Sequence, residues 1–98
     1  MPIYIVLGNY TQKGIEEVKE TDKKLKTTHN WVKEYQGEIK HLFYTFGRYD
    51  FVAITEFPDN NTMMKAVLRI VRSGEVRTET LVTIPVEDYV SISKELPD

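Results

Sequence analysis

The 98-residue chain has no cysteine, no long apolar run and no surplus of basic residues. Without cysteine there is no disulfide framework, thiol nucleophile or Cys-ligated metal, which fits a reducing compartment. The apolar runs are far shorter than the ~20 residues that cross a bilayer, and residues 1–4 lack the positive start of a signal peptide. Thirteen basic against fifteen acidic side chains give a net charge of −2. We therefore expect a cytoplasmic protein with no membrane and no nucleic-acid partner.

Hydrophobic residues make up 41% of the chain and charged residues 29%, which is typical of an ordinary globular domain. A chain of this length has room for one core, so residues 1–98 are expected to form a single domain. Folding should hide roughly 65% of the surface that the unfolded chain exposes. That is enough for two layers of secondary structure without disulfides.

The hydrophobic periodicity predicts strands at residues 3–10, 38–46, 50–57 and 75–84 and helices at 11–36, 63–73 and 85–95. A helix of 26 residues would measure ~39 Å beside a strand of ~26 Å, so we expect a break near residues 20–22. Thr21 or Asp22 would cap the second segment, and Gly37 and Gly74 would end the two long helices. Apolar residues surround most of the helix at 63–73, which predicts that it is widely buried.

The element order is that of two similar βαβ halves, and right-handed crossovers leave few topologies for it. The simplest is an α+β, ferredoxin-like βαββαβ fold in which the apolar first and third strands are central in a four-stranded antiparallel sheet. Both long helices would then cover the same face. The other face would carry one alternate set from each central strand: Ile3, Ile5 and Leu7 or Tyr4, Val6 and Tyr10 from the first, and Phe51, Ala53 and Phe57 or Val52 and Ile54 from the third. Either set is too apolar for water, so we expect a face-to-face partner, most simply a second copy.

The motif Gly47-Arg48-Tyr49-Asp50, with the flanking segments 4–11 and 74–80, resembles the GYD domain family along nearly the whole chain. The resemblance implies a dimeric α+β barrel, and the family carries no assigned biochemical role. Residues 47–80 also resemble the effector-binding domain of the Lrp/AsnC regulators, with Gly47, Asp50, Gly74 and Val76 at the matching positions of a small-molecule site between subunits. The first strand begins at residue 3, so no helix-turn-helix precedes it and DNA binding is not implied.

The hairpin between the second and third strands is the sharpest candidate site. In a functional interpretation, Arg48 and Asp50 hold the charged ends of a small ligand beside Tyr49. In a structural interpretation, Gly47 adopts a positive φ, Asp50 accepts a backbone N–H and Tyr49 packs on a neighbouring chain, which is the more frequent use of such residues. The candidate ligand-binding residues are Gly47, Arg48, Tyr49, Asp50, Tyr44 and His41.

Sequence motifs for catalysis, metals or cofactors are not found. His29 and His41 are the only imidazoles, and no serine or carboxylate stands at a telling spacing from either. No metal or cofactor is expected. Trp31 lies beside the apolar stripe of the first helix, and Glu20 and Asp22 stand four residues before Lys24 and Lys26, which indicates a self-paired, solvated face.

Three functions fit these patterns. The leading hypothesis is a non-enzymatic homo-oligomer that binds a small metabolite between sheets or subunits. The second is a cofactor-independent monooxygenase or isomerase that uses Tyr44, His41 and Tyr4 near an interior cavity. The third is an assembly module with a solid interface and no pocket.

Overall fold

A computed structural model describes residues 1–98. Its four strands are β1 (Ile3–Tyr10), β2 (Glu38–Tyr44), β3 (Phe51–Glu56) and β4 (Val76–Val82). They form one antiparallel sheet in the order β2-β3-β1-β4. The apolar strands are central and the strands with charged residues are at the edges, where solvent reaches them. The α+β, ferredoxin-like prediction is therefore confirmed.

The segment after β1 is broken, as its length predicts. It comprises α1 (Gln12–Glu16), the 3-10 helix η1 (Val18–Glu20) and α2 (Thr21–Glu34). The predicted cap is wrong, because no side chain caps α2 and the Thr21 hydroxyl donates to the Val18 carbonyl at 2.6 Å. Thr11 is the residue that caps a helix here, since its hydroxyl oxygen accepts the Gly14 N–H at 3.2 Å.

The second crossover helix, α3 (Asn60–Arg72), begins three residues before the predicted start. The reason is its cap: the Asp59 carboxylate accepts the Thr62 N–H at 2.8 Å and satisfies a backbone donor that the helix itself leaves free. The prediction of wide burial for this helix is wrong. Only Met63 and Ala66 are buried, whereas Met64 and Leu68 are 56% and 58% exposed, because α3 packs on one layer and has solvent on its other side.

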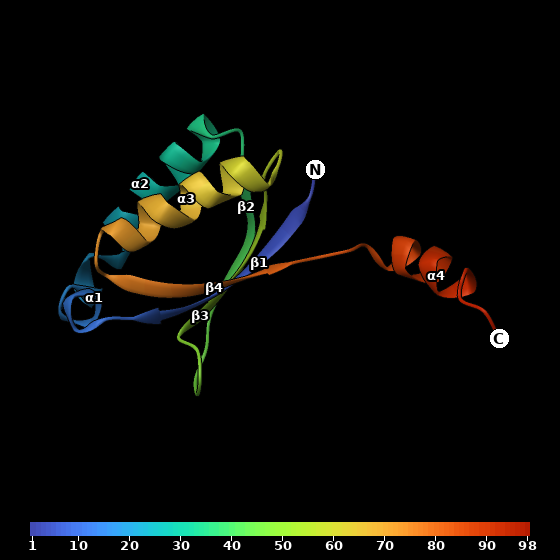
Figure 1. The fold of residues 1–98 in the computed structure, drawn as a ribbon. Helices are drawn as coiled ribbons and strands as arrows, with labels where there is room; N and C mark the ends of the chain where they lie inside the picture. The colour runs from blue at the N-terminus through green and yellow to red at the C-terminus, as the bar shows by residue number, and fades with distance from the viewer.

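Both α2 and α3 lie over the same face of the sheet (Figure 1). The core between these layers consists of Tyr4, Trp31, Val32, Phe57, Met63 and Ala66. Trp31 is part of this core and does not lie beside it as predicted, since α2 turns the indole onto the sheet, where only 8% of the residue stays exposed. Arg69 then covers the ring at 4.9 Å in a cation–π contact.

The opposite face of the sheet is uncovered, and we call it the open face. The register aligns Ile5 with Ile54 and Leu81, and Leu7 with Val52. Of the two alternate sets of side chains predicted for each central strand, the open face therefore carries Ile3, Ile5 and Leu7 from β1 and Val52 and Ile54 from β3. Phe43 of β2 is 56% exposed and Leu81 of β4 is 40% exposed there. The predicted apolar, uncovered face is confirmed.

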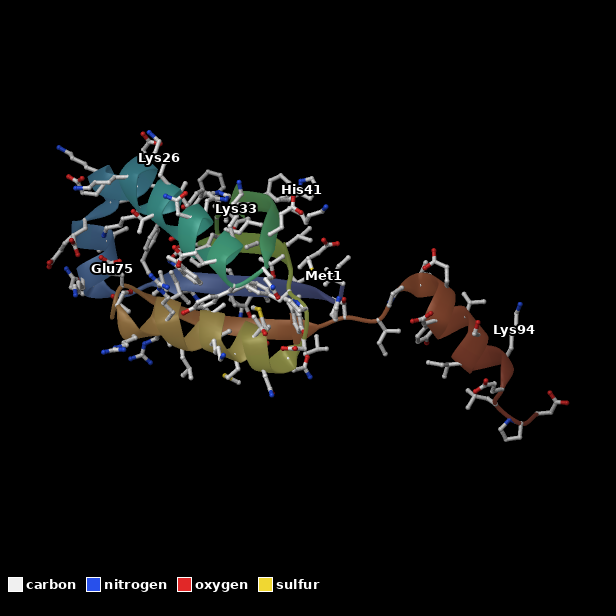
Figure 2. The ribbon with its side chains drawn as sticks, turned by 90° about the horizontal axis from the view of Figure 1, so that it is seen from above. Met1, Lys26, Lys33, His41, Glu75 and Lys94 are labelled. Carbon is white, nitrogen blue, oxygen red and sulfur yellow. The ribbon has the colours of Figure 1, made fainter.

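The C-terminal segment stands away from the body of the protein in both views (Figures 1 and 2). The Thr83 hydroxyl still donates to the Ile3 carbonyl at 2.6 Å, but every residue from 84 to 98 is exposed. This segment contains the predicted helix, α4 (Val86–Lys94), which begins after Pro85. Its apolar side chains therefore have no cover within the single chain.

The helix α2 ends at a different residue from the predicted one. Gln36, with a φ of 61°, takes the left-handed conformation, and Gly37 does not. Gly37 is instead buried against Phe57, and a Cβ atom on it would stand 2.4 Å from the ring atom Cε1. Glycine is needed at 37 for space and not for its φ angle. Gly74, with a φ of 76°, does take the left-handed conformation just after α3.

Gly37→Ala should destabilise the fold by about 1–3 kcal/mol, because the added methyl group overlaps a ring that is itself buried. Urea unfolding measures the change. Lys33→Ala, at an exposed position of α2, is the matched control and should stay within about 0.5 kcal/mol of the parent protein. Equal stability of the two variants would contradict the close approach of Gly37 and Phe57.

Candidate functional site

The hairpin between β2 and β3 is held by its own backbone and one hydroxyl. The Thr45 N–H donates to the Asp50 carbonyl at 2.8 Å, and the Thr45 hydroxyl donates to the Tyr49 carbonyl at 2.6 Å. Gly47 has a φ of 91°, which a residue with a side chain adopts only with strain. The positive φ expected at this position is confirmed.

Asp50 fastens this hairpin to the central strand β1. Its N–H donates to the Gly8 carbonyl at 2.8 Å, and its carboxylate oxygen Oδ2 accepts the Tyr10 N–H at 2.8 Å. The Asn9 side-chain oxygen accepts the same Asp50 N–H at 3.2 Å. The carboxylate is thus used inside the protein, as the structural interpretation of this residue predicts.

Tyr49 and Arg48 lie toward the open face. The Tyr49 hydroxyl donates to Glu79 Oε1 at 2.9 Å, and this hydrogen bond raises the pKa of Tyr49 above its ordinary value. Glu79 is paired with Leu7 and shares its face of the sheet. The Arg48 guanidinium stands 5.8 Å from the centre of the Tyr49 ring. These two side chains therefore border the surface where a second copy is expected.

Residues 74–80, the last of the three segments that carry the family resemblance, begin beside the same end of β1. The Thr11 N–H donates to the Glu75 carbonyl at 2.9 Å, and the Thr11 hydroxyl donates to the Gly74 carbonyl at 2.5 Å. Gly14 packs so closely here that a Cβ atom would stand 2.1 Å from the Glu75 carbonyl oxygen. The segments around residues 10, 50 and 75, which are far apart in the sequence, thus converge where β1 ends.

A cavity of about 180 Å³ lies between the sheet and the helices α2 and α3. It lies within one subunit, on the covered face, and a site between subunits stays a prediction. Most of its walls are apolar, and they include Val6, Leu25, Val32, Ala53, Ala66 and Ile70. Small-molecule sites are usually apolar clefts or cavities of about 300–1,000 Å³, so this one has the usual character at a small size.

Three aromatic residues form one wall of the cavity. The Phe51 ring lies directly against Gly8, where a Cβ atom would be 2.0 Å from the ring. The rings of Tyr10 and Tyr44 stand 6.5 and 6.2 Å from the Phe51 ring. Burial, and then the neighbouring Tyr10 hydroxyl, raises the pKa of Tyr44 to about 12. Tyr44 is therefore an uncharged group at neutral pH.

One buried polar atom of the residues that line the cavity is left without a partner. The Thr78 hydroxyl oxygen is buried and forms no hydrogen bond. The Thr55 hydroxyl, which also lines the cavity, donates to the Tyr4 carbonyl at 3.0 Å. Nearly all buried polar groups in proteins are hydrogen-bonded, so Thr78 is exceptional. The alternation of residues 76–82 could have indicated the face on which Thr78 lies. Arg77 and Glu79 mark the solvent side of the strand, so Thr78 falls on the side that faces the helices.

An ion cluster forms the rim of the cavity. The Lys24 ammonium group lies 2.6 Å from Glu75 Oε1 and 3.6 Å from Glu17 Oε1. The hydrogen bond with Lys24 lowers the pKa of Glu75, and the same bond raises the pKa of Lys24. The three side chains are 35%, 24% and 42% exposed in the order Lys24, Glu75, Glu17, so the cavity reaches the surface at this end. The expected pair of Glu20 with Lys24 is replaced by this cluster, whereas Lys26 does pair with Asp22 at 3.4 Å.

The structure does not bring the predicted site residues together around the cavity. Of the six candidates, Gly47, Arg48, Tyr49, Asp50, Tyr44 and His41, only Tyr44 lines it. His41 is paired with Ile54 and lies on the open face, stacked on Phe43 at 6.1 Å. Figure 2 shows His41 far from Glu75, which marks the rim of the cavity. The Tyr4 hydroxyl is held by Asn60 at 2.6 Å.

Other features relevant to a site are few. His29 is exposed on α2. No group of three or more His, Asp or Glu residues is arranged to hold a metal ion. None of the helices combines the length and the apolar character that crossing a membrane requires.

The rim cluster predicts a pH-dependent stability. Because its folded-state pKa is lowered, Glu75 stabilises the fold above its ordinary pKa of about 4.5, and this contribution is lost as the pH falls through the lower folded-state value. Glu75→Gln should therefore be less stable than the parent protein at pH 7, with the difference in unfolding free energy closing below pH 4. Urea titrations from pH 3 to 7 measure it. Glu34→Gln, at an exposed end of α2, should show no such trend, and a pH-independent difference at Glu75 would contradict the ion pair.

Comparison with known proteins agrees with this architecture. A family model described as the GYD domain matches residues 4–92. The "Glutamine synthetase and cystathionine beta-lyase binding protein" of Thermus thermophilus is 30% identical over 92 residues, which cover 93% of this chain and 97% of that protein. No solved structure matches. With a match over nearly its whole length and the motif segments gathered at the end of β1, the chain belongs to the GYD domain family.

Proposed function

We propose that this GYD domain protein is a non-enzymatic, cytoplasmic homo-oligomer that binds a small molecule in the cavity between its helices and its sheet. The observation that carries the proposal is the apolar cavity of about 180 Å³ between the sheet and the two long helices. The cavity also favours this hypothesis over a pure assembly module, for which we expect no pocket.

The ionisable side chains around the cavity support a binding role over catalysis. They are Tyr10, Tyr44 and the rim residues Lys24, Glu17 and Glu75. Lys24 is paired with both carboxylates, and the raised pKa makes Tyr44 a poor base. A monooxygenase or isomerase that uses His41 with Tyr44 has less support, because the sheet separates these two side chains.

The open face supports the homo-oligomer. Ile5 is flanked by Ile54 on one neighbouring strand and by Leu81 on the other, so the apolar side chains form a continuous surface. Surfaces of this kind on a soluble protein mark an interface, and the simplest closed assembly is a two-fold pair in which both copies use the same face.

Ligand binding is tested by a thermal-shift screen of amino acids and other small metabolites. A ligand at a hundred times its Kd stabilises a folded protein by about 2.7 kcal/mol, which raises the Tm of a domain of this size by on the order of 10 °C. We expect at least one compound to give such a shift. A uniform lack of stabilisation across a wide library would count against the binding role.

The assembly is tested by Ile5→Lys. A charge at the centre of the open face should convert the oligomer to a folded single subunit, because an unpaired charge cannot be buried in an apolar interface. Light scattering gives the mass, and circular dichroism checks the fold. Leu68→Lys, an exposed apolar residue on the outer side of α3, is the control and should leave the mass unchanged. A parent protein that is already a single subunit would sink the proposal of a homo-oligomer.

A second candidate function, binding of another protein, is favoured by α4. Val86, Tyr89 and Val90 share one side of this helix by their spacing, and Tyr89 is 66% exposed. An isolated helix of nine residues is marginal in water, so α4 gains stability by docking on a partner. The Thermus relative is named as a binding protein for two enzymes, which supports such a role here.

This candidate predicts that Tyr89→Lys combined with Val90→Lys weakens binding to a partner enzyme, with the glutamine synthetase of the same cell as the first probe. Loss of the apolar anchors should raise the Kd by tenfold or more, measured by calorimetry. Ser91→Lys, on the opposite side of α4, is the matched control. Equal Kd values for both variants would show that α4 is not the docking element.

A further inference from the structure

We infer that the hairpin between β2 and β3 is a docking element, and that Phe46 at its tip anchors it to a second copy of the chain. The inference deepens the homo-oligomer of the proposed function and rests on it. It follows from three properties of the hairpin, which are the exposure of Phe46, the rigidity of the tip and the side of the sheet to which the hairpin extends.

Phe46 is the most exposed large apolar residue of the single chain, at 102%. Phe43 and Tyr44, on the strand that leads to the tip, are 56% and 50% exposed, so each keeps part of its surface covered. The Phe46 ring packs on nothing in its own subunit. Aromatic residues are enriched in the cores of protein interfaces, and this ring is free to bury its whole surface in a partner.

The tip that presents Phe46 is fixed by hydrogen bonds. The neighbouring Thr45 donates its N–H to the Asp50 carbonyl at 2.8 Å and its hydroxyl to the Tyr49 carbonyl at 2.6 Å. Asp50 is hydrogen-bonded in turn to the central strand β1. A preorganised loop loses little conformational entropy when it binds, so an exposed aromatic ring on this tip is suited to anchor an interface.

The hairpin extends past the sheet on the side of the open face. Figure 1 shows its end below the sheet, whereas α2 and α3 lie above. The Tyr49 hydroxyl bonds to Glu79 on the open face, and Phe43 lies there opposite Val52, so the apolar surface continues toward the tip. Stacked sheets pack only about 10 Å apart, so a hairpin that extends past the open face reaches the molecule that covers it.

A second copy of the chain is the occupant whose charges complement the tip. Arg48, two residues after Phe46, forms no ion pair in its own chain, and neither does Glu79 on the open face. The tip therefore presents an aromatic ring beside an unpaired cation, and the open face presents apolar side chains beside an unpaired carboxylate. In a two-fold pair that uses the open face of both copies, each tip meets the face of the other copy.

Phe46→Ala tests the anchor through the dissociation constant of the homo-oligomer, measured by sedimentation equilibrium of the full chain. Loss of an aromatic anchor should raise this constant about thirtyfold or more. The circular dichroism spectrum should stay unchanged, because Phe46 packs on nothing in its own subunit. Met64→Ala truncates an exposed apolar residue of α3, on the other side of the sheet. It is the matched control and should leave the dissociation constant unchanged.

Fluorescence gives an independent measurement. Phe46→Trp keeps an aromatic anchor, and the introduced indole should be shielded from quenching by acrylamide in the assembled protein. Dilution to the single subunit should make the indole accessible. Trp31 is the chain's one tryptophan and is buried in the core, so it contributes a constant background.

The two proposals fail in different ways. If the parent protein is an oligomer and Phe46→Ala leaves its dissociation constant unchanged, the docking role of the hairpin is wrong and the homo-oligomer stands. The same holds if the indole of Phe46→Trp stays accessible in the assembled protein, or if Met64→Ala weakens assembly as much as Phe46→Ala does. A parent protein that is a single subunit at every concentration overturns both proposals.

Discussion

Both crossover helices of this protein lie on the same face of a four-stranded sheet, and most of its other properties depend on that placement. Crossovers between strands of one sheet are almost always right-handed, and in this strand order that handedness brings α2 and α3 to one side. α2 contacts the edge strand β2, and α3 contacts the opposite edge strand β4. The two helices therefore pack over the edge strands, and the cavity lies between them and the middle of the sheet.

The same placement leaves the protein with a small core. Only 11 of the 98 residues are buried in the single chain, because one layer of helices excludes solvent from only one face of the sheet. The apolar residues of the open face and of α4 have no cover of their own. Covering them in an assembly would add to the stability of the fold, since burial of apolar surface is its main favourable contribution.

The family motif is explained by the way β1 is held at its end. Asp50 from the hairpin and Glu75, the residue just before β4, both form hydrogen bonds to the stretch from Gly8 to Thr11. Because β1 is central, it carries the register of both neighbouring strands, and a slip of one residue would exchange the covered face for the open face. The motif thus fixes which side chains face the cavity, although the hairpin residues 47–50 themselves lie outside it. In the proposed function the covered face binds a ligand and the open face joins copies.

Hydrophobic periodicity and the right-handedness of crossovers were enough to predict the strand order, the central position of β1 and β3 and one uncovered apolar face, because both are local or general rules. It left open which alternate set of each strand meets the helices, since both sets are apolar and only packing between distant segments distinguishes them. The burial of Trp31, the space that Gly37 must leave for Phe57 and the separation of His41 from Tyr44 were likewise decided by tertiary structure. The free hydroxyl of Thr78 is the clearest case. Whether a hydroxyl finds a partner depends on every atom around it, and those atoms come from segments that only the folded chain brings together.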